Sequence, residues 1–210
     1  KEIFSNALKD ADAVLAIVIS SGVSQTFNSA MVAKADFPDA QIEVIDSQTT
    51  AMAMGFICLA AARAAAEGKP LAEVKKLAED YKNKVGVIFV VDTLDYLHRG
   101  GRIGGAQKFI GNALNVKPVL ELRGGKVEPL ERVRTKKKAI EYMINTIAER
   151  VAGKTLRLAT IHANAEVEAK ELLANATTRL KPVETVLAEV SPVVGTHTGP
   201  GTVGLAWCAE

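Results

Sequence analysis

The chain has 210 residues, of which 48% are hydrophobic and 24% charged, so it is long enough to bury one large core or two smaller ones. Its formal net charge of +2 gives no electrostatic reason to expect binding to nucleic acid or to an anionic membrane surface. Two cysteines, Cys58 and Cys208, are too few for a disulfide framework or a cysteine metal site. The longest apolar stretch, 51–66, contains Arg63 and is too short to span a bilayer. We therefore expect a cytoplasmic protein with no metal, no cofactor, no nucleic-acid partner and no stable membrane insertion.

The first part of the chain alternates strand and helix patterns. Residues 3–8 already follow helical spacing and Lys1 is not an initiator, so we expect an N-terminal portion of a longer protein to be missing here. Residues 13–19 form an uninterrupted apolar run, which is typical of a strand buried on both faces. A hydroxyl-rich turn over 20–26 and a helical pattern from Phe27 follow, an arrangement that presents backbone N–H groups to an anion. The alternative is that Ser21 or Ser24 only caps this helix.

A second unit of the same kind follows. Residues 41–46 alternate like a strand, and a polar turn leads into a helix over 51–67. Asp46 could orient a hydroxyl or cap this helix, and capping is the safer interpretation. An amphipathic helix over 71–81 precedes a new buried strand at 85–91. We place a domain boundary at Asn83, so that 1–83 form an α/β domain with a mainly parallel sheet, incomplete in this chain.

The second domain, residues 84–210, has a different pattern. Two alternating runs on either side of Gly124-Gly125 predict a β-hairpin over 117–134. Further strands are predicted at 157–162, 184–190 and 202–208, with helices between them. About six strands result, and they indicate an α+β domain with a largely antiparallel sheet. We expect a ligand cleft between the two domains.

Two glycine-rich segments in this domain are candidate sites. In 98–105 the cations Arg99 and Arg102 alternate with glycines, so the loop could hold a phosphate, although it matches neither a P-loop nor a dinucleotide fingerprint. A solvated loop that packs against a neighbour is at least as good an interpretation. In 194–204, His197 and its flanking hydroxyls lie on a polar turn shaped by glycine and Pro200. This turn could bind a ligand, or it could simply join two strands.

Five motifs, in this order and at this spacing, resemble the DegV family along nearly the whole chain. They are residues 19–27, Asp46-Ser47 with Met54-Gly55, 93–97 with 99–104, Lys117-Pro118-Val119, and 195–201. The resemblance implies a two-domain protein that binds a long-chain fatty acid between its domains. Some members of the family serve as the lipid-carrying subunit of bacterial fatty-acid kinase, so the resemblance also suggests that this protein presents the acyl carboxylate to a separate ATP-binding kinase subunit. The hydroxyl-rich turn over 20–26 is called the serine turn below. The family's Thr-Ser-Gln-Pro-type motif ahead of this turn does not occur here.

Carried over to this sequence, the resemblance places the carboxylate of the fatty acid at the serine turn and at the glycine-rich segment 194–204, which carries His197. We expect Ser20, Ser21, His197 and Thr198 to hold it, because hydroxyls, N–H groups and an imidazole can all donate to a carboxylate. Arg99 and Arg102 are candidates to face a partner protein. No residue is expected to be catalytic. The acyl chain needs an apolar tunnel, for which the candidates are Phe27, Met54, Phe109, Ile110 and Leu114.

Two other functions are compatible with the residue types. Ser20 or Ser21 could form a hydrolase triad with His197 and either Asp46 or Asp92, but the Gly-x-Ser-x-Gly elbow is missing. Arg99 and Arg102 could instead form a module that binds phosphate or a nucleotide. Turnover of a chromogenic ester would favour the first of these functions, and tight ATP binding without bound lipid would favour the second.

Overall fold

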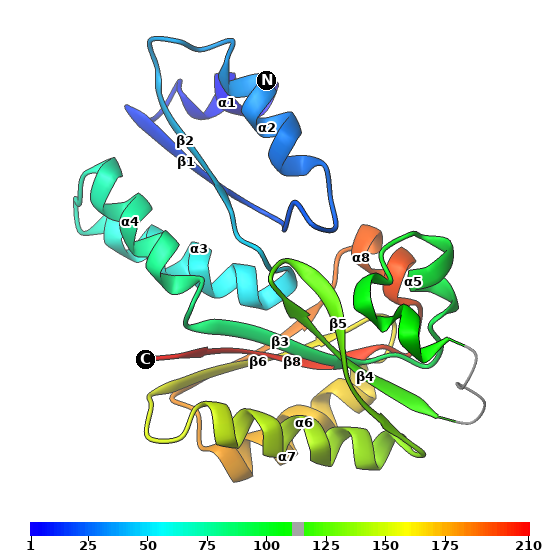
Figure 1. The fold of residues 1–210 in the computed structure, drawn as a ribbon. Helices are drawn as coiled ribbons and strands as arrows, with labels where there is room; N and C mark the ends of the chain where they lie inside the picture. Colours follow the sequence, from blue (N-terminus) through cyan, green and yellow to red (C-terminus); the bar gives the residue numbers. More distant parts are fainter. Residues whose placement is uncertain (111–115) are drawn as a thin grey trace.

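The structure is a computed structural model that describes residues 1–110 and 116–210. Figure 1 shows a small sheet near the N-terminus and a larger sheet through the middle of the molecule. In chain order the elements are α1 (Glu2–Ala7), β1 (Ala13–Val18), α2 (Thr26–Lys34), β2 (Gln41–Asp46), α3 (Ala51–Ala66), α4 (Leu71–Tyr81), β3 (Val85–Val90), α5 (Asp95–Arg99), the 3-10 helix η1 (Gly104–Phe109), β4 (Lys117–Arg123), β5 (Lys126–Val133), α6 (Lys136–Arg150), β6 (Leu156–His162), α7 (Glu166–Leu180), β7 (Glu184–Glu189), α8 (Pro192–Thr198) and β8 (Val203–Ala209).

The small sheet consists of β1 and β2, which are parallel, as the strand, turn and helix pattern predicts. Their register pairs Ala13 with Gln41 and Val18 with Asp46, so both strands end next to the serine turn. The expectation that this first strand is buried on both faces is wrong, because every residue of β1 is only half-buried. In the described part of the chain only β2 pairs with β1, and Leu15 and Ile17 pack toward α3 and α4. The rest of the strand therefore keeps partial access to solvent.

The large sheet has six strands in the order β5-β4-β3-β8-β6-β7. Neighbouring strands are antiparallel except β6 and β7, which are parallel, so the expected sheet of about six largely antiparallel strands is confirmed. The predicted hairpin joins β4 and β5 through Gly124 and Gly125, whose φ angles are +57° and +78°. Two successive positive φ angles are what a tight two-residue hairpin turn requires, and glycine adopts them without steric cost.

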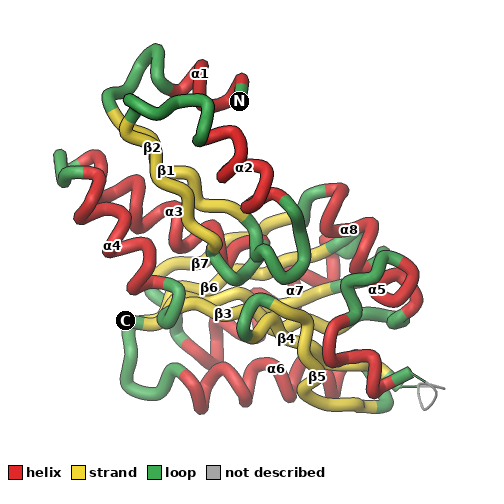
Figure 2. Tube along the Cα trace, turned by 45° about the horizontal axis from the view of Figure 1, so that its top comes forward, coloured by secondary structure: helices red, strands yellow, loops and turns green. Residues whose placement is uncertain are grey.

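Helices cover both faces of the large sheet. In Figure 1, α6 and α7 lie below the sheet and α3 lies above it. The central strand β8 alternates between these layers: Leu205 and Trp207 join the core under α6 and α7, whereas Ala206 and Cys208 pack with Phe56 of α3. Both faces are therefore apolar, and the upper face is only partly covered by α3. Figure 2 shows that the turn between β1 and α2 lies over this same upper face, between α3 and α8.

Helix α3 connects the two sheets. On one side Ile57 and Ala61 pack with Ile45 of β2 and with α4, and on another side Ala53 and Phe56 pack on the large sheet. Because one helix contributes to the core of both units, the two predicted domains share a packed boundary; the division at Asn83 stays a prediction. No helix in the described ranges is both long and apolar enough to cross a lipid bilayer.

A group of polar side chains fixes α4 to the end of the large sheet. Tyr81 donates a hydrogen bond to Glu210, which also pairs with Arg157 of β6 and lies 3.7 Å from the Nζ of Lys84. Burial, and then the hydrogen bond to Glu210, raises the pKa of Tyr81 to about 12, so the hydroxyl keeps the proton that it donates. The same hydrogen bond is the largest cause of the lowered pKa of Glu210, and Arg157 and Lys84 lower it further.

Replacing Tyr81 by phenylalanine is expected to raise the pKa of Glu210 toward its ordinary value and to cost about 1 kcal/mol of stability at neutral pH. A carboxyl whose pKa is lowered by folding stabilises the protein above its unfolded pKa, and this stabilisation is lost as the pH falls through the folded pKa. The difference between Tyr81→Phe and the original chain should therefore shrink in acid. A carboxyl NMR titration of Glu210 and urea unfolding at neutral and acidic pH measure both effects. An unchanged Glu210 titration would contradict the prediction.

Candidate functional site

A cavity of about 500 Å³ lies on the upper face of the large sheet, under the serine turn and between α3 and α8. This volume is in the range of about 300–1,000 Å³ that is typical of small-molecule sites. Most of its wall is apolar and comes from elements that are far apart in the sequence. The polar residues on the wall are Ser24, Thr26, Thr50, Arg102, Glu189, Ser191, His197, Thr198 and Thr202.

The floor of the cavity follows from side-chain alternation in the large sheet. Val87 and Phe89 of β3 and Ile161 of β6 face the cavity. Between these two strands lies β8, whose smallest residue, Gly204, pairs with both Phe89 and Ile161. Leu122 and Val127, from the two strands of the hairpin, close one side. The result is a hollow over the middle of the sheet.

The serine turn lies next to this cavity, but its two predicted hydroxyls have other partners. The Ser20 side chain is fully buried, donates to the Gly125 carbonyl at 2.7 Å and accepts from the Gly22 N–H at 3.1 Å. The Ser21 hydroxyl donates to the Asp46 carboxylate at 2.5 Å, and the Ser21 N–H donates to the same carboxylate at 3.1 Å. Neither serine belongs to the cavity wall, and their role in binding stays a prediction.

Asp46 has the role that the sequence interpretation ranked second. It orients the Ser21 hydroxyl and also accepts from the Gln48 N–H at 2.9 Å, so the preference for helix capping is wrong. Thr50 is the N-cap of α3, and no side chain caps that end. The carboxylate lies at the end of β2, where the parallel register places it beside the end of β1, and this brings it within reach of Ser21.

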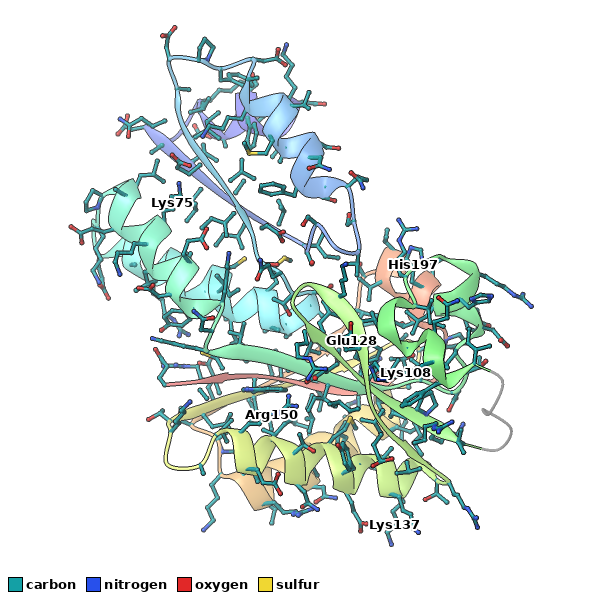
Figure 3. All side chains as sticks on the ribbon, in the orientation of Figure 1. Lys75, Lys108, Glu128, Lys137, Arg150 and His197 are labelled. Carbon is teal, nitrogen blue, oxygen red and sulfur yellow. The ribbon has the colours of Figure 1, made fainter. Side chains whose placement is uncertain are left out.

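His197 and Thr198 both line the cavity, as the histidine motif predicts. The expectation of a turn over the whole segment is wrong in its first half, because both residues belong to the last turn of α8. Ser191 caps this helix by accepting from the Val194 N–H at 3.4 Å, and the helix ends at Gly199, where φ is +82°. Figure 3 shows His197 on α8, beside α5.

The polar atoms of these two side chains have unequal surroundings. The Thr198 hydroxyl donates to the Val194 carbonyl at 3.2 Å and keeps acceptor capacity. The His197 Nδ1 is buried and has no hydrogen-bond partner among the described residues. This nitrogen lies against Gly100, at the end of α5. The described hydrogen bonds do not involve the other ring nitrogen, Nε2, and the side chain lines the cavity, so Nε2 is the atom that remains for a ligand.

The structure separates the two predicted arginines. Arg102 lines the cavity, where its Nε donates to the Val23 carbonyl at 3.1 Å and its Nη1 to the Gly100 carbonyl at 2.6 Å. Arg99, the last residue of α5, is exposed and does not line the cavity. The guanidinium of Arg102 thus brings positive charge to the wall, and the two arginines do not meet there as a phosphate clamp.

The five residues predicted to line an acyl tunnel have different positions. Met54 lies on the cavity wall, but Phe27 and Phe109 are half-buried outside it. Ile110 is 42% exposed, and Leu114 lies outside the described residues. The ring of Phe109 is covered by the guanidinium of Arg132 at 4.8 Å. The apolar wall residues that sequence reasoning missed are Ile19, Val23, Ala51, Met52, Val87, Phe89, Leu97, Leu122, Val127, Ile161, Ala188, Val190, Val193 and Val194.

The geometry does not support a hydrolase triad. The Ser21 hydroxyl is held by Asp46, the Ser20 hydroxyl by Gly125, and the described hydrogen bonds join neither serine to His197. The other candidate acid, Asp92, pairs with the Nζ of Lys117 at 2.7 Å. A nucleophilic serine must donate its hydroxyl proton to its base, whereas both described hydroxyls donate to other acceptors, Gly125 and Asp46.

The fold and the site together define a class of α/β protein that has a small parallel sheet and a larger, mostly antiparallel sheet. A large, mainly apolar cavity lies on the larger sheet, under the turn that follows the first strand. The sequence profile of the family described as "Uncharacterised protein, DegV family" matches residues 1–210. The chain is 39% identical over 204 residues to a DegV domain-containing protein of Clostridium acetobutylicum. This match covers 95% of this chain and 71% of that protein. The chain belongs to the DegV family.

Two solved structures show the same fold. A structure described as "Fatty Acid Binding of a DegV family Protein from Thermus thermophilus" has a TM-score of 0.92 and 34% identity, and the match covers 100% of this chain and 75% of that one. The structure of "DegV, a fatty acid binding protein from Bacillus subtilis" has a TM-score of 0.88 and 37% identity, with the same coverage. Both proteins are thus described as binding fatty acids.

Proposed function

We propose that this chain binds a long-chain fatty acid in the cavity above the large sheet. The observation that carries the proposal is the composition of the wall: it is mostly apolar, and its polar side chains include an imidazole and a guanidinium. An acyl chain gains about 0.8 kcal/mol for each methylene group that it buries, and a carboxylate needs donors or positive charge when it leaves water. The two solved relatives that are described as fatty-acid-binding proteins support the same ligand.

The carboxylate is proposed to bind next to His197 and Thr198, within the field of Arg102. All three line the cavity, and the imidazole Nε2 and the guanidinium can both donate charge-assisted hydrogen bonds. Ser20 and Ser21 stay proposed contributors. For either hydroxyl to donate to a carboxylate, it must leave its present acceptor, Gly125 for Ser20 and Asp46 for Ser21.

We further propose that the bound acid is presented to the ATP-binding subunit of a fatty-acid kinase, which phosphorylates its carboxylate. This chain then acts as a carrier and supplies no catalytic residue. Arg99 is exposed at the end of α5, close in sequence to Arg102 on the cavity wall, and is the candidate contact for that subunit. Loss of acyl-phosphate formation in Arg99→Ala, with palmitate affinity unchanged, is the result that this role requires.

Binding itself is tested with the purified chain and palmitate as the probe. Organic extraction and mass spectrometry should find a fatty acid in the fresh preparation, and His197→Ala should lower palmitate affinity about 10- to 100-fold, the value of one hydrogen bond to a charged group. His98→Ala is the matched control, because His98 is exposed on α5 and away from the wall. The unfolding midpoint should change little in either variant. A chain that neither carries nor binds fatty acid would overturn the proposal.

A further inference from the structure

The contact between α5 and α8 depends on a glycine at the end of α5. A Cβ added to Gly100 would overlap the His197 Nδ1 and would lie 2.9 Å from the imidazole Cε1. Yet the backbone of Gly100, with φ −75° and ψ −7°, is one that any residue adopts. Glycine is therefore needed here for space, because the imidazole occupies the position that a side chain would take.

A second glycine makes the reverse contact. Gly199, at the end of α8, has φ +82°, and a Cβ there would overlap the ring of Tyr96 on α5. Each helix thus ends in a glycine that receives an aromatic or imidazole ring of the other helix. Two such contacts along one short interface restrict how α8 can turn or slide on α5. The position of the His197 ring is fixed accordingly.

The same contact bears on the protonation of the imidazole. The direction in which a Cβ would leave Gly100 is that of one of its Cα–H bonds, so this hydrogen points at the His197 Nδ1. A proton on Nδ1 would be a buried donor facing a C–H group, which is costly, whereas an unprotonated Nδ1 accepts a weak C–H contact. The neutral imidazole then carries its proton on Nε2, the nitrogen left for the cavity.

We infer that Gly100 is a positioning residue for ligand binding: it holds the His197 imidazole against α5 in the tautomer that points an N–H donor at the ligand. This inference rests on the proposed function for its meaning, because the ligand that accepts from Nε2 is the fatty-acid carboxylate. The tautomer and the packing do not depend on the ligand. They can be measured even if no fatty acid binds.

The first experiment measures the tautomer of His197 in the original chain, and a variant serves only to assign the signal. In the ¹⁵N NMR spectrum of the histidine side chains at about pH 8, where an ordinary imidazole is neutral, His197 should show a protonated Nε2 and an unprotonated Nδ1. The His197→Ala spectrum assigns the signal among the three histidines of the chain. A protonated Nδ1 in the original chain would overturn the inference, whatever the result with palmitate.

The second experiment is a double-mutant cycle on palmitate affinity and on urea unfolding. Gly100→Ala should lower the affinity about tenfold or more and should also lower stability, but in the His197→Ala background the same change should alter the affinity less than twofold. Equal losses in both backgrounds would show that the glycine does not act through the imidazole. If the original chain binds no palmitate, the unfolding arm of the cycle still decides the packing claim.

Gly195→Ala is the matched control for this cycle. Gly195 lies in α8, two residues before His197, and a new Cβ there would meet nothing closer than 3.8 Å. Alanine in a helix is favoured over glycine by about 0.5–1 kcal/mol, so this variant should fold at least as stably as the original and bind palmitate equally well. A loss of affinity in Gly195→Ala equal to that in Gly100→Ala would show a general sensitivity of α8 and would contradict the specific role of Gly100.

Discussion

Replacing Met54 by tryptophan is expected to lower palmitate affinity more than a hundredfold. Met54 lies in the first turn of α3 and its side chain is on the cavity wall. An indole at this position takes space inside the cavity that the acyl chain would otherwise fill. If it displaces about four methylene groups, the loss is ~3 kcal/mol, which corresponds to more than a hundredfold in affinity. Isothermal titration calorimetry with palmitate measures the loss.

The chain length of the probe makes this test specific. Because the carboxylate is proposed to bind near His197, a bulky group elsewhere on the wall should penalise long acids more than short ones. The affinity for octanoate should therefore fall less than the affinity for palmitate. Met31→Trp is the matched control, since Met31 on α2 is 43% exposed and does not line the cavity. Unchanged palmitate binding by Met54→Trp would exclude this cavity as the acyl site.

Local patterns predicted the elements well, because each of these elements is specified by residues close together in the chain. The Gly124-Gly125 pair defined the hairpin, and the alternation in 41–46 defined β2. One missed element had a local signal as well. Ser191-Pro192 is a cap followed by proline at the first helical position, a typical helix start, and it precedes α8. Had this helix start been given more weight than the glycines of 194–204, the sequence would have predicted His197 on a helix.

Burial and partners were less predictable, because they depend on contacts between distant parts of the chain. The acceptor of the Ser20 hydroxyl is Gly125, 105 residues later, and no periodicity in the sequence indicates that pair. The apolar run of β1 correctly predicts a strand, yet its burial depends on how many neighbours cover it. Of the site residues that the sequence motifs predicted, His197, Thr198, Arg102 and Met54 line the cavity. The wall residues from the sheet were missed, since an inward-facing strand residue looks the same whether it meets a helix or a cavity.

Gly204→Ala is expected to destabilise the fold by about 3 kcal/mol, a large part of the 5–15 kcal/mol that is typical of a native protein. Gly204 lies in β8, the strand between β3 and β6, and it pairs with Phe89 and Ile161, which both line the cavity. A Cβ there would be 2.7 Å from the Ile88 carbonyl oxygen, 2.7 Å from the Phe89 Cβ and 3.0 Å from the Phe89 Cα. Two of these atoms belong to the backbone of the paired strand, so they cannot rotate away as a flexible side chain could. The sheet itself has to separate or the strand has to shift.

The size of the added group distinguishes this mechanism from ordinary overpacking of a core. Since the first carbon already meets the backbone, Gly204→Ala should account for most of the loss, and Gly204→Val should add less than alanine does. Overpacking against mobile side chains would instead increase steadily with volume. Urea unfolding gives the comparison, provided that the slope with denaturant stays constant across the variants. If Gly204→Ala lowers the unfolding free energy by less than about 1 kcal/mol, β3 and β8 can separate at this point. The floor of the cavity would then be a compliant surface that adapts to its ligand.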